Sequence, residues 1–216
     1  MRTVLSLAEQ TRLLEGQLKQ FFPDGRALGE LKPLVDRTFA KTEYCFSRIK
    51  LSGYSDDGVA NFNYLHSEQY AVFLYFASHL AWKEQNNIEL ASKLFCLNKA
   101  LNGFLCMYDT ILPDVFVIVH SVGTVLGKAN YGNYFAVYQN VTIGSDRGHM
   151  PTFGERVVVN GGSFVIGKCH LGDNVSVAAK SFLFNEDIPD DSIVAGRSPS
   201  LVIKPAHRKL ADLIFH

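Results

Sequence analysis

The chain has 216 residues, of which 47% are hydrophobic and 19% are charged, a composition typical of a folded globular protein and not of a disordered one. Its 21 basic and 21 acidic residues give a formal net charge of +0 at pH 7, so no overall charge attracts it to nucleic acid or to an anionic membrane. No apolar stretch is long and uncharged enough to predict a membrane span, and residues 1–22 lack the apolar core of a secretory signal. We therefore expect a cytoplasmic protein that acts on a small ligand.

The four cysteines, Cys45, Cys96, Cys106 and Cys169, are scattered without the close spacing that metal sites use. In a reducing compartment such residues usually serve as small apolar groups. We expect all four to be buried, and we expect no metal site.

The first 105 residues carry apolar patterns with helical spacing. Helices are predicted at 5–21, 30–49, 65–87 and 88–101, with a connection at 51–63. Ser67 is the expected N-cap of the third helix, Glu68 lies in its first turn, and Asn102-Gly103 ends the fourth. The third helix also carries aromatic residues that we expect to pack in a core rather than to line a ligand site: Tyr70, Phe73, Tyr75 and Phe76.

From about Val115 the pattern changes to a six-residue repeat. An apolar residue heads each step between residues 153 and 184, namely Phe153, Val159, Val165, Leu171, Val177 and Leu183. The period of an α-helix is 3.6 residues and that of a strand is 2, so neither explains this repeat. A short strand and a turn fill each step, and three steps close one triangular coil of a parallel β-helix.

Continued towards the N-terminus, the repeat predicts inward-pointing residues at Val119, Val125, Tyr131, Val137 and Ile143. Ten residues then separate Ile143 from Phe153, where six are expected. The four additional residues predict a loop extruded from the coil within GSDRGHMPT, residues 144–152.

Four motifs follow one another along the repeat. They are His120 with Gly123, the sequence QNVTIG at 139–144, a loop with His149 before Pro151, and AGRSP at 195–199. In order and spacing they resemble the left-handed β-helix acyltransferases with hexapeptide repeats, and among these the bacterial serine O-acetyltransferases, over residues 109–204. The resemblance implies an α+β chain, in which an N-terminal α-helical domain precedes a left-handed parallel β-helix.

The resemblance also suggests how the chain is organised. We expect an α-helical domain at 1–108, the β-helix acyltransferase domain at 109–204, and a short C-terminal helix or tail at 205–216. Because this family builds its active sites between neighbouring subunits, the resemblance implies a homotrimer, which could pair into a hexamer through the helical domains.

His120 matches the histidine that, in this family, takes the proton of the acceptor hydroxyl as its oxygen attacks the thioester of acetyl-CoA. Imidazole, with a pKa near 6.5, is suited to accept that proton at neutral pH. His149 matches a second active-site histidine that contacts the acceptor. An upstream aspartate orients the base in the family; Asp109 is the preferred match and Asp114 the alternative, and either could instead cap the turn before the first coil.

For the acetyl donor, acetyl-CoA, the family uses small residues and backbone amides, since a branched side chain would block the pantetheine arm. The positions that match are Ser145, Gly161 and Ala179. Weaker matches are Gly162 and three basic residues that could bind the phosphates: Lys180, Arg197 and Lys204.

Two features depart from serine acetyltransferases. Val119 stands where the family has an aspartate that helps to hold the amino acid, and the loop before His149 is shorter. The sequence ADLIFH also differs from the tail with a terminal isoleucine that docks into cysteine synthase. The main prediction is therefore an acetyl-CoA-dependent O-acetyltransferase that acts on a hydroxyl of a small molecule or sugar. L-serine O-acetylation and amino-sugar N-acetylation are the alternatives.

Two hypotheses come from other classes of protein. A γ-type carbonic anhydrase would need three histidines to converge on zinc, but His120, His149 and His170 lie at different heights of the predicted coil. A β-helix without catalytic activity could serve only for assembly, and the histidines and small residues named above argue against it.

Overall fold

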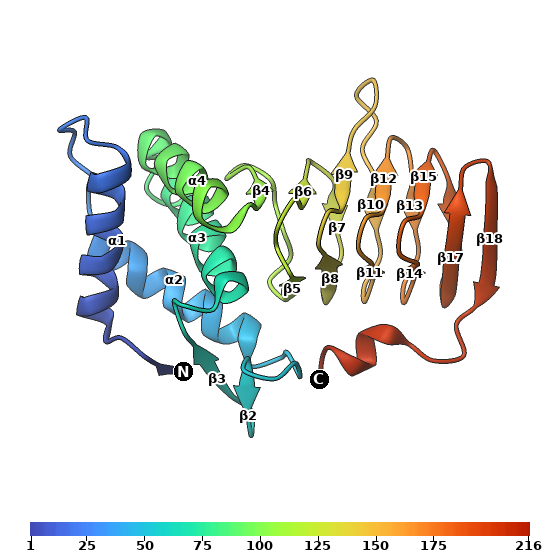
Figure 1. Cartoon of the computed structure of the whole chain (residues 1–216), viewed down its shortest axis with the longest axis horizontal. Coiled ribbons are helices and arrows are strands. Elements are labelled where there is room, and N and C mark those ends of the chain that lie inside the picture. The colour runs from blue at the N-terminus through green and yellow to red at the C-terminus, as the bar shows by residue number, and fades with distance from the viewer.

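The computed structural model describes residues 1–216, with a helical part at one end of the long axis and a solenoid at the other (Figure 1). The helices are α1 (Leu7–Phe21), α2 (Leu31–Phe46), α3 (Ser67–Lys83) and α4 (Ile88–Asn102), and a 3₁₀ turn spans Leu210–Leu213. A small sheet accompanies them, formed by β1 (Arg2–Thr3), β2 (Ser55–Asp56) and β3 (Val59–Phe62). The four predicted helices are present, whereas the expected connection at 51–63 contains the antiparallel pair β2 and β3.

Local capping explains where the helices begin and end. Ser6 and Glu9 form a capping box at the start of α1, and Gly103 ends α4 in the left-handed conformation with φ of 62°. At the start of α3 the prediction of Ser67 was wrong. The cap is His66, whose Nδ1 accepts a hydrogen bond from the Gln69 amide at 3.5 Å.

Helix α3 is the centre of the helical part, because every residue from Gln69 to Ala81 is buried. The four aromatic residues expected in the core are all buried there, as predicted. Tyr75 also connects this helix to the solenoid: its hydroxyl donates to the Thr110 carbonyl at 2.8 Å and accepts from the Leu112 amide at 2.9 Å.

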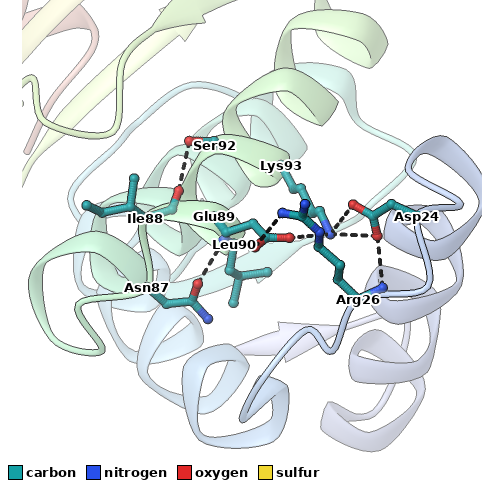
Figure 2. A network of polar contacts seen from close by, with 8 residues as sticks. All are labelled: Asp24, Arg26, Asn87, Ile88, Glu89, Leu90, Ser92 and Lys93. Carbon is teal, nitrogen blue, oxygen red and sulfur yellow. Dashed lines mark hydrogen bonds and ion pairs between the residues drawn. The ribbon is translucent and has the colours of Figure 1, made fainter.

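A polar network fastens the segment after α1 to the start of α4 (Figure 2). The Nζ of Lys93 lies 2.9 Å from Asp24 Oδ2 and 3.1 Å from Glu89 Oε1, and Arg26 reaches the other oxygen of Glu89 at 3.2 Å. The hydrogen bond from Lys93 holds the pKa of Asp24 below its usual value. Asn87 caps the helix by accepting from the Leu90 amide.

The solenoid has three faces of parallel strands and makes about five turns. The first face contains β4 (Leu105–Cys106), β6 (Val125–Leu126), β9 (Thr142–Gly144), β12 (Phe164–Ile166) and β15 (Phe182–Phe184). The second contains β5 (Phe116–Val119), β8 (Phe135–Tyr138), β11 (Val158–Val159), β14 (Ser176–Val177) and β17 (Ser192–Arg197). The third contains β7 (Asn130–Tyr131), β10 (Thr152–Phe153), β13 (His170–Leu171) and β16 (Asp187–Ile188).

Strand β18 (Ser200–Pro205) folds back antiparallel onto β17 and closes the far end of the coil, so that the last parallel strand is not left as an open edge. The chain then returns along the solenoid (Figure 1). Phe215, near the C-terminus, is fully buried and forms a β-bridge with Ile49 of the helical part.

The strand register confirms the repeat in the later coils and corrects it in the first. Val137, Val159 and Val177 stack in consecutive coils and are fully buried. In the first coil, however, Ile118 pairs with Val137, and Leu126 pairs with Ile143. The inward residues there are Ile118 and Leu126, both fully buried, and not the predicted Val119 and Val125, which are only half-buried.

The helical part and the solenoid share one continuous core of 53 buried residues. Phe116 of β5 packs edge-on against Tyr75 and Phe76 of α3. The Sγ of Cys45 on α2 lies 3.2 Å from the Phe116 carbonyl, and burial raises the pKa of that thiol to about 12. Cys45, Cys106 and Cys169 are buried as predicted, but Cys96 is exposed.

None of the helices has both the length and the apolar character needed to cross a lipid bilayer.

Candidate functional site

The corner that carries His120 is longer than the equivalent corner of the next coil. Val119 pairs with Tyr138 and Val125 pairs with Thr142. Six residue steps therefore connect β5 to β6 where only four connect the paired positions of β8 and β9. The two additional residues make the chain bulge at His120.

Hydrogen bonds to the end of α4 hold this corner in place. The Ser121 hydroxyl donates to the Asn102 carbonyl at 2.8 Å, and the Gly123 amide donates to the Gly103 carbonyl at 3.0 Å. His120 itself has φ of 56°, a left-handed conformation that ten other non-glycine residues of this chain also adopt, among them Asn140 and Lys180 at corners of the later coils. The length of this corner therefore distinguishes His120, and its backbone conformation does not.

The His120 side chain is 73% exposed and lies at the rim of a cavity of about 200 Å³ between the start of α3 and the end of β5. The lining residues are Leu51, Ser52, Tyr54, His66, Glu68, Ile118, Val119 and His120. The cavity thus combines two histidines and one carboxylate with an apolar wall that includes Val119.

Glu68 is the carboxylate that approaches His120. Its Oε1 lies 3.9 Å from His120 Nδ1, and its Oε2 lies 3.2 Å from His66 Nδ1. The other polar contact of this side chain is a 2.9 Å hydrogen bond from the Ser67 hydroxyl. Tyr54 also lines the cavity, and its ring packs edge-on against the imidazole of His66. Burial raises the pKa of Tyr54, with a further contribution from the charge of Glu68.

The two aspartates expected near His120 lie elsewhere. Asp109 forms an ion pair with Lys128 at 2.9 Å and lines a separate cavity of about 360 Å³ beside β7. Asp114 pairs with Lys41 of α2 at 3.1 Å. Neither carboxylate forms an ion pair with His120 within this chain, and Asp109 as the residue that orients the base stays a prediction.

His149 lies at the end of the extruded loop between β9 and β10, which projects from the coil as predicted (Figure 1). Its backbone closes a tight turn with Asp146 through two hydrogen bonds of 2.8 and 3.0 Å. The imidazole is exposed, so it is free to contact a ligand or a neighbouring subunit.

The predicted donor residues fall on two corners of the first face. Gly161, Gly162, Ala179 and Lys180 lie on the corner that precedes β12 and β15, joined by the hydrogen bond from the Lys180 amide to the Gly161 carbonyl. A Cβ on Gly161 would lie 3.1 Å from the Gln139 side chain, so this corner is closely packed. Ser145 follows β9 and therefore lies on the opposite corner of the same face.

The two remaining basic residues lie at the end of the solenoid. Arg197 packs its guanidinium over the Phe182 ring, 5.1 Å from the centroid. Lys204 is on β18, opposite Ile193 of β17, beside a cavity of about 440 Å³. Both side chains are exposed. The structure thus brings Gly161, Ala179 and Lys180 together and places Ser145 and Lys204 apart from them.

No cluster of three or more His, Cys, Asp or Glu side chains is arranged to bind a metal ion.

Comparison with known proteins identifies the family. No protein-family model matches the chain. The serine acetyltransferase of Staphylococcus aureus is 30% identical over 160 residues, which cover 68% of this chain and 74% of that protein. The chain belongs to the serine acetyltransferase family. The serine acetyltransferase of Synechococcus elongatus is 33% identical over 122 residues, 53% of this chain, and the match spans only about half (49%) of that longer protein.

Solved structures of serine acetyltransferases have the same fold as this chain. One in complex with cysteine has a TM-score of 0.68 at 19% identity and covers 90% of this chain and 83% of its own. Another, in complex with CoA, has a TM-score of 0.64 at 18% identity with the same coverage. The predicted fold class, an N-terminal helical part followed by a β-helix of the acyltransferase type, is confirmed.

Proposed function

We propose that this serine acetyltransferase family member is an acetyl-CoA-dependent O-acetyltransferase whose acceptor is L-serine. The observation that carries the proposal is His120, which is exposed on a longer corner at the rim of a small cavity that Glu68 and His66 also line. The relatives named above support serine over the sugar hydroxyl favoured by the sequence alone. They also favour acetylation of oxygen over the amino-sugar alternative.

In the proposed reaction, His120 Nε2 accepts the proton of the acceptor hydroxyl while the oxygen attacks the thioester carbonyl carbon of acetyl-CoA. The new carbon–oxygen bond forms, the carbon–sulfur bond breaks, and the CoA thiolate leaves with the electron pair. The proton held by His120 then passes to that sulfur. The products are an O-acetyl ester and CoA, and the base returns to its neutral form.

The donor is proposed to lie along the corner formed by Gly161, Ala179 and Lys180, where Ala179 and Lys180 are exposed and Gly161 and Ala179 are small. Lys180 and Arg197, both exposed, would contact the phosphate groups. Gly162, on the same corner, and Ser145 and Lys204, which lie apart from it, are also proposed donor contacts.

His149 is proposed to contact the acceptor from its loop, and because that loop projects away from its own coil, the contact would reach the site of a neighbouring subunit. Such a contact requires an oligomer, and we propose a homotrimer, with a hexamer as the larger form that the helical domains could build. Phe164 and Phe184, which are 40% and 39% exposed on the first face, provide apolar surface for such packing. Sedimentation velocity tests this, and a monomer at micromolar concentration would contradict shared sites.

The domain limits at 108 and 204 and the cytoplasmic location also stay predictions.

The decisive test is a spectrophotometric assay of CoA release from acetyl-CoA with L-serine, homoserine and a panel of nucleotide sugars. We expect L-serine to be the best acceptor, and His120→Ala to lower kcat by about 10²- to 10⁴-fold. His170→Ala, which removes an exposed imidazole on β13, is the matched control and should retain full activity. A sugar acceptor turned over faster than serine would refute the assignment of substrate, and an active His120→Ala would refute the assignment of the base.

A further inference from the structure

We infer that Glu68 is the positioning residue of His120: the carboxylate at the start of α3 receives Nδ1–H of the imidazole and leaves Nε2 free to accept a proton. The inference rests on the proposed function, since it concerns the same base. It assigns to α3 a role that the resemblance gave to an aspartate upstream of His120.

The carboxylate of Glu68 is itself held in place. Its side chain is only 19% exposed, and its Oε2 accepts a hydrogen bond from the Ser67 hydroxyl at 2.9 Å and lies 3.2 Å from His66 Nδ1. Oε1 has no hydrogen-bond partner and faces His120 Nδ1 at 3.9 Å. An anchored carboxylate with one free oxygen directed at one imidazole nitrogen has the geometry by which such groups fix a histidine tautomer.

The remaining gap closes by movement of one side chain. The His120 imidazole is 73% exposed and makes no hydrogen bond, so its side-chain torsions are free to change. Hydrogen bonds of catalytic groups are often long in ligand-free enzymes and shorten when substrate binds. A shift of about 1 Å in the ring brings Nδ1 to the usual hydrogen-bond distance of about 2.9 Å.

A general role in stabilising the helix does not account for the surroundings of Glu68. Glu89 holds the same position in the first turn of α4, two residues after the N-cap, and it is engaged by Arg26 and Lys93 (Figure 2). Glu68 has no lysine or arginine within ion-pair distance. The groups that face it are the two imidazoles of His66 and His120, so its charge is available to the imidazolium that forms during proton transfer.

The test uses the full-length protein with Glu68→Gln, which removes the charge, and Glu68→Leu, which also removes the acceptor atom. Glu89→Gln is the matched control, because it neutralises a carboxylate at the same helical position. We expect kcat to fall about 10- to 100-fold in both Glu68 variants, the range for loss of a hydrogen bond to a charged group, with the KM for serine nearly unchanged. Glu89→Gln should keep the kcat of the parent protein.

A second readout does not depend on turnover. ¹⁵N NMR of the imidazoles at pH 8, with His120 assigned by comparison with His120→Gln, reports which nitrogen carries the proton. We expect Nδ1–H in the parent protein and a shift towards Nε2–H in Glu68→Leu.

Two results would overturn the inference. An unchanged His120 tautomer in Glu68→Leu would mean that the carboxylate does not orient the ring. A large rise in the KM for serine at constant kcat would instead make Glu68 a ligand of the substrate ammonium group. If the parent protein orients His120 as expected but acetylates no acceptor, then the proposed function fails while the positioning role stands.

Discussion

The register of the first coil predicts a difference in stability between two adjacent positions. Leu126 is fully buried and stacks on Ile143, whereas Val125 is half-buried and pairs with Thr142. A strict six-residue repeat would make Val125 the core residue. Truncating each side chain to alanine therefore distinguishes the observed register from the one that the sequence alone predicts.

The expected magnitudes follow from burial. Leu126→Ala removes a fully buried side chain and should cost about 3 kcal/mol, within the range of about 2–5 kcal/mol for such changes. Val125→Ala removes a partly exposed group and should cost less than about 1 kcal/mol. Val137→Ala is the size-matched control: it is a fully buried valine at an undisputed inward position, and loss of its two methyl groups should cost about 2 kcal/mol.

Urea unfolding followed by circular dichroism measures these differences, with thermal melting as a check. For a protein of this size, 1 kcal/mol corresponds to a Tm change of about 2–4 °C, so Leu126→Ala should melt about 6–12 °C below the parent protein. All variants must be compared at one protein concentration, because dissociation of an oligomer would add to the measured stability. If Val125→Ala cost as much as Val137→Ala, the register described here would be wrong.

Three further outcomes are expected. Gly132→Ala should destabilise the fold by about 1–3 kcal/mol, because its Cβ would lie 2.1 Å from the Gly154 carbonyl oxygen. Gly16→Ala should stabilise the fold by about 1 kcal/mol, because Gly16 is inside helix α1 and a Cβ there would meet no other atom within 4 Å. Thermal melting curves of the two variants test both expectations. A thiol reagent should label the exposed Cys96 rapidly at pH 8, whereas Cys45, which is buried and has a pKa raised to about 12, should react only on unfolding. Mass spectrometry of the labelled peptides gives the order of modification, and labelling of Cys45 before Cys96 would contradict the prediction. Burial lowers the pKa of His79, so the unfolded state binds more protons than the folded state, and the free energy of unfolding should fall as the pH drops through about 6.5. Urea titrations at pH 7.5 and 5.5 measure this fall, which should be smaller in His79→Gln. A fall of the same size in the variant and the parent protein would contradict the prediction.

The sequence predicts the solenoid best where its coils are regular. Between Phe153 and Leu183 every step has six residues, and the corresponding strands pair at a constant offset, as Val158 does with Ser176 and Phe164 with Phe182. A period is a local property of the chain, so it can be read without knowledge of contacts. The extruded loop was predictable for the same reason, since the repeat continues in phase on both sides of it.

The six-residue repeat did not predict the inward residues of the first coil, because the steps of that coil are unequal in length. Eight residues separate the inward positions Ile118 and Leu126, and five separate Leu126 from Tyr131. A repeat continued from the later coils reaches Tyr131 before these unequal steps begin, so it predicts Tyr131 correctly and misses both inward positions that precede it. Only pairing with the next coil reveals the shift.

The site shows the same division between local and long-range information. His120 could be proposed from its neighbouring motif, but Glu68 and His66 precede it by more than 50 residues and lie at the start of helix α3. They reach His120 because α3 packs against β5, through contacts such as the one between Phe76 and Phe116. A carboxylate in the first turn of a helix ordinarily suggests stabilisation of the helix terminus, so nothing in the sequence distinguished Glu68 from Glu89.

The failed register and the candidate base therefore have one cause. A corner of ordinary length would keep the chain close to the coil, where a side chain can only pack or point outward between neighbouring turns. The two additional residues make the chain bulge at His120, whose side chain lines the cavity beside the start of α3. A departure from a regular repeat carries a cost in backbone strain, and such departures are expected where a site requires a geometry that the repeat cannot supply. The longer corner, the exposed histidine and the anchored carboxylate coincide at one place, and this coincidence supports the proposal that His120 is the base.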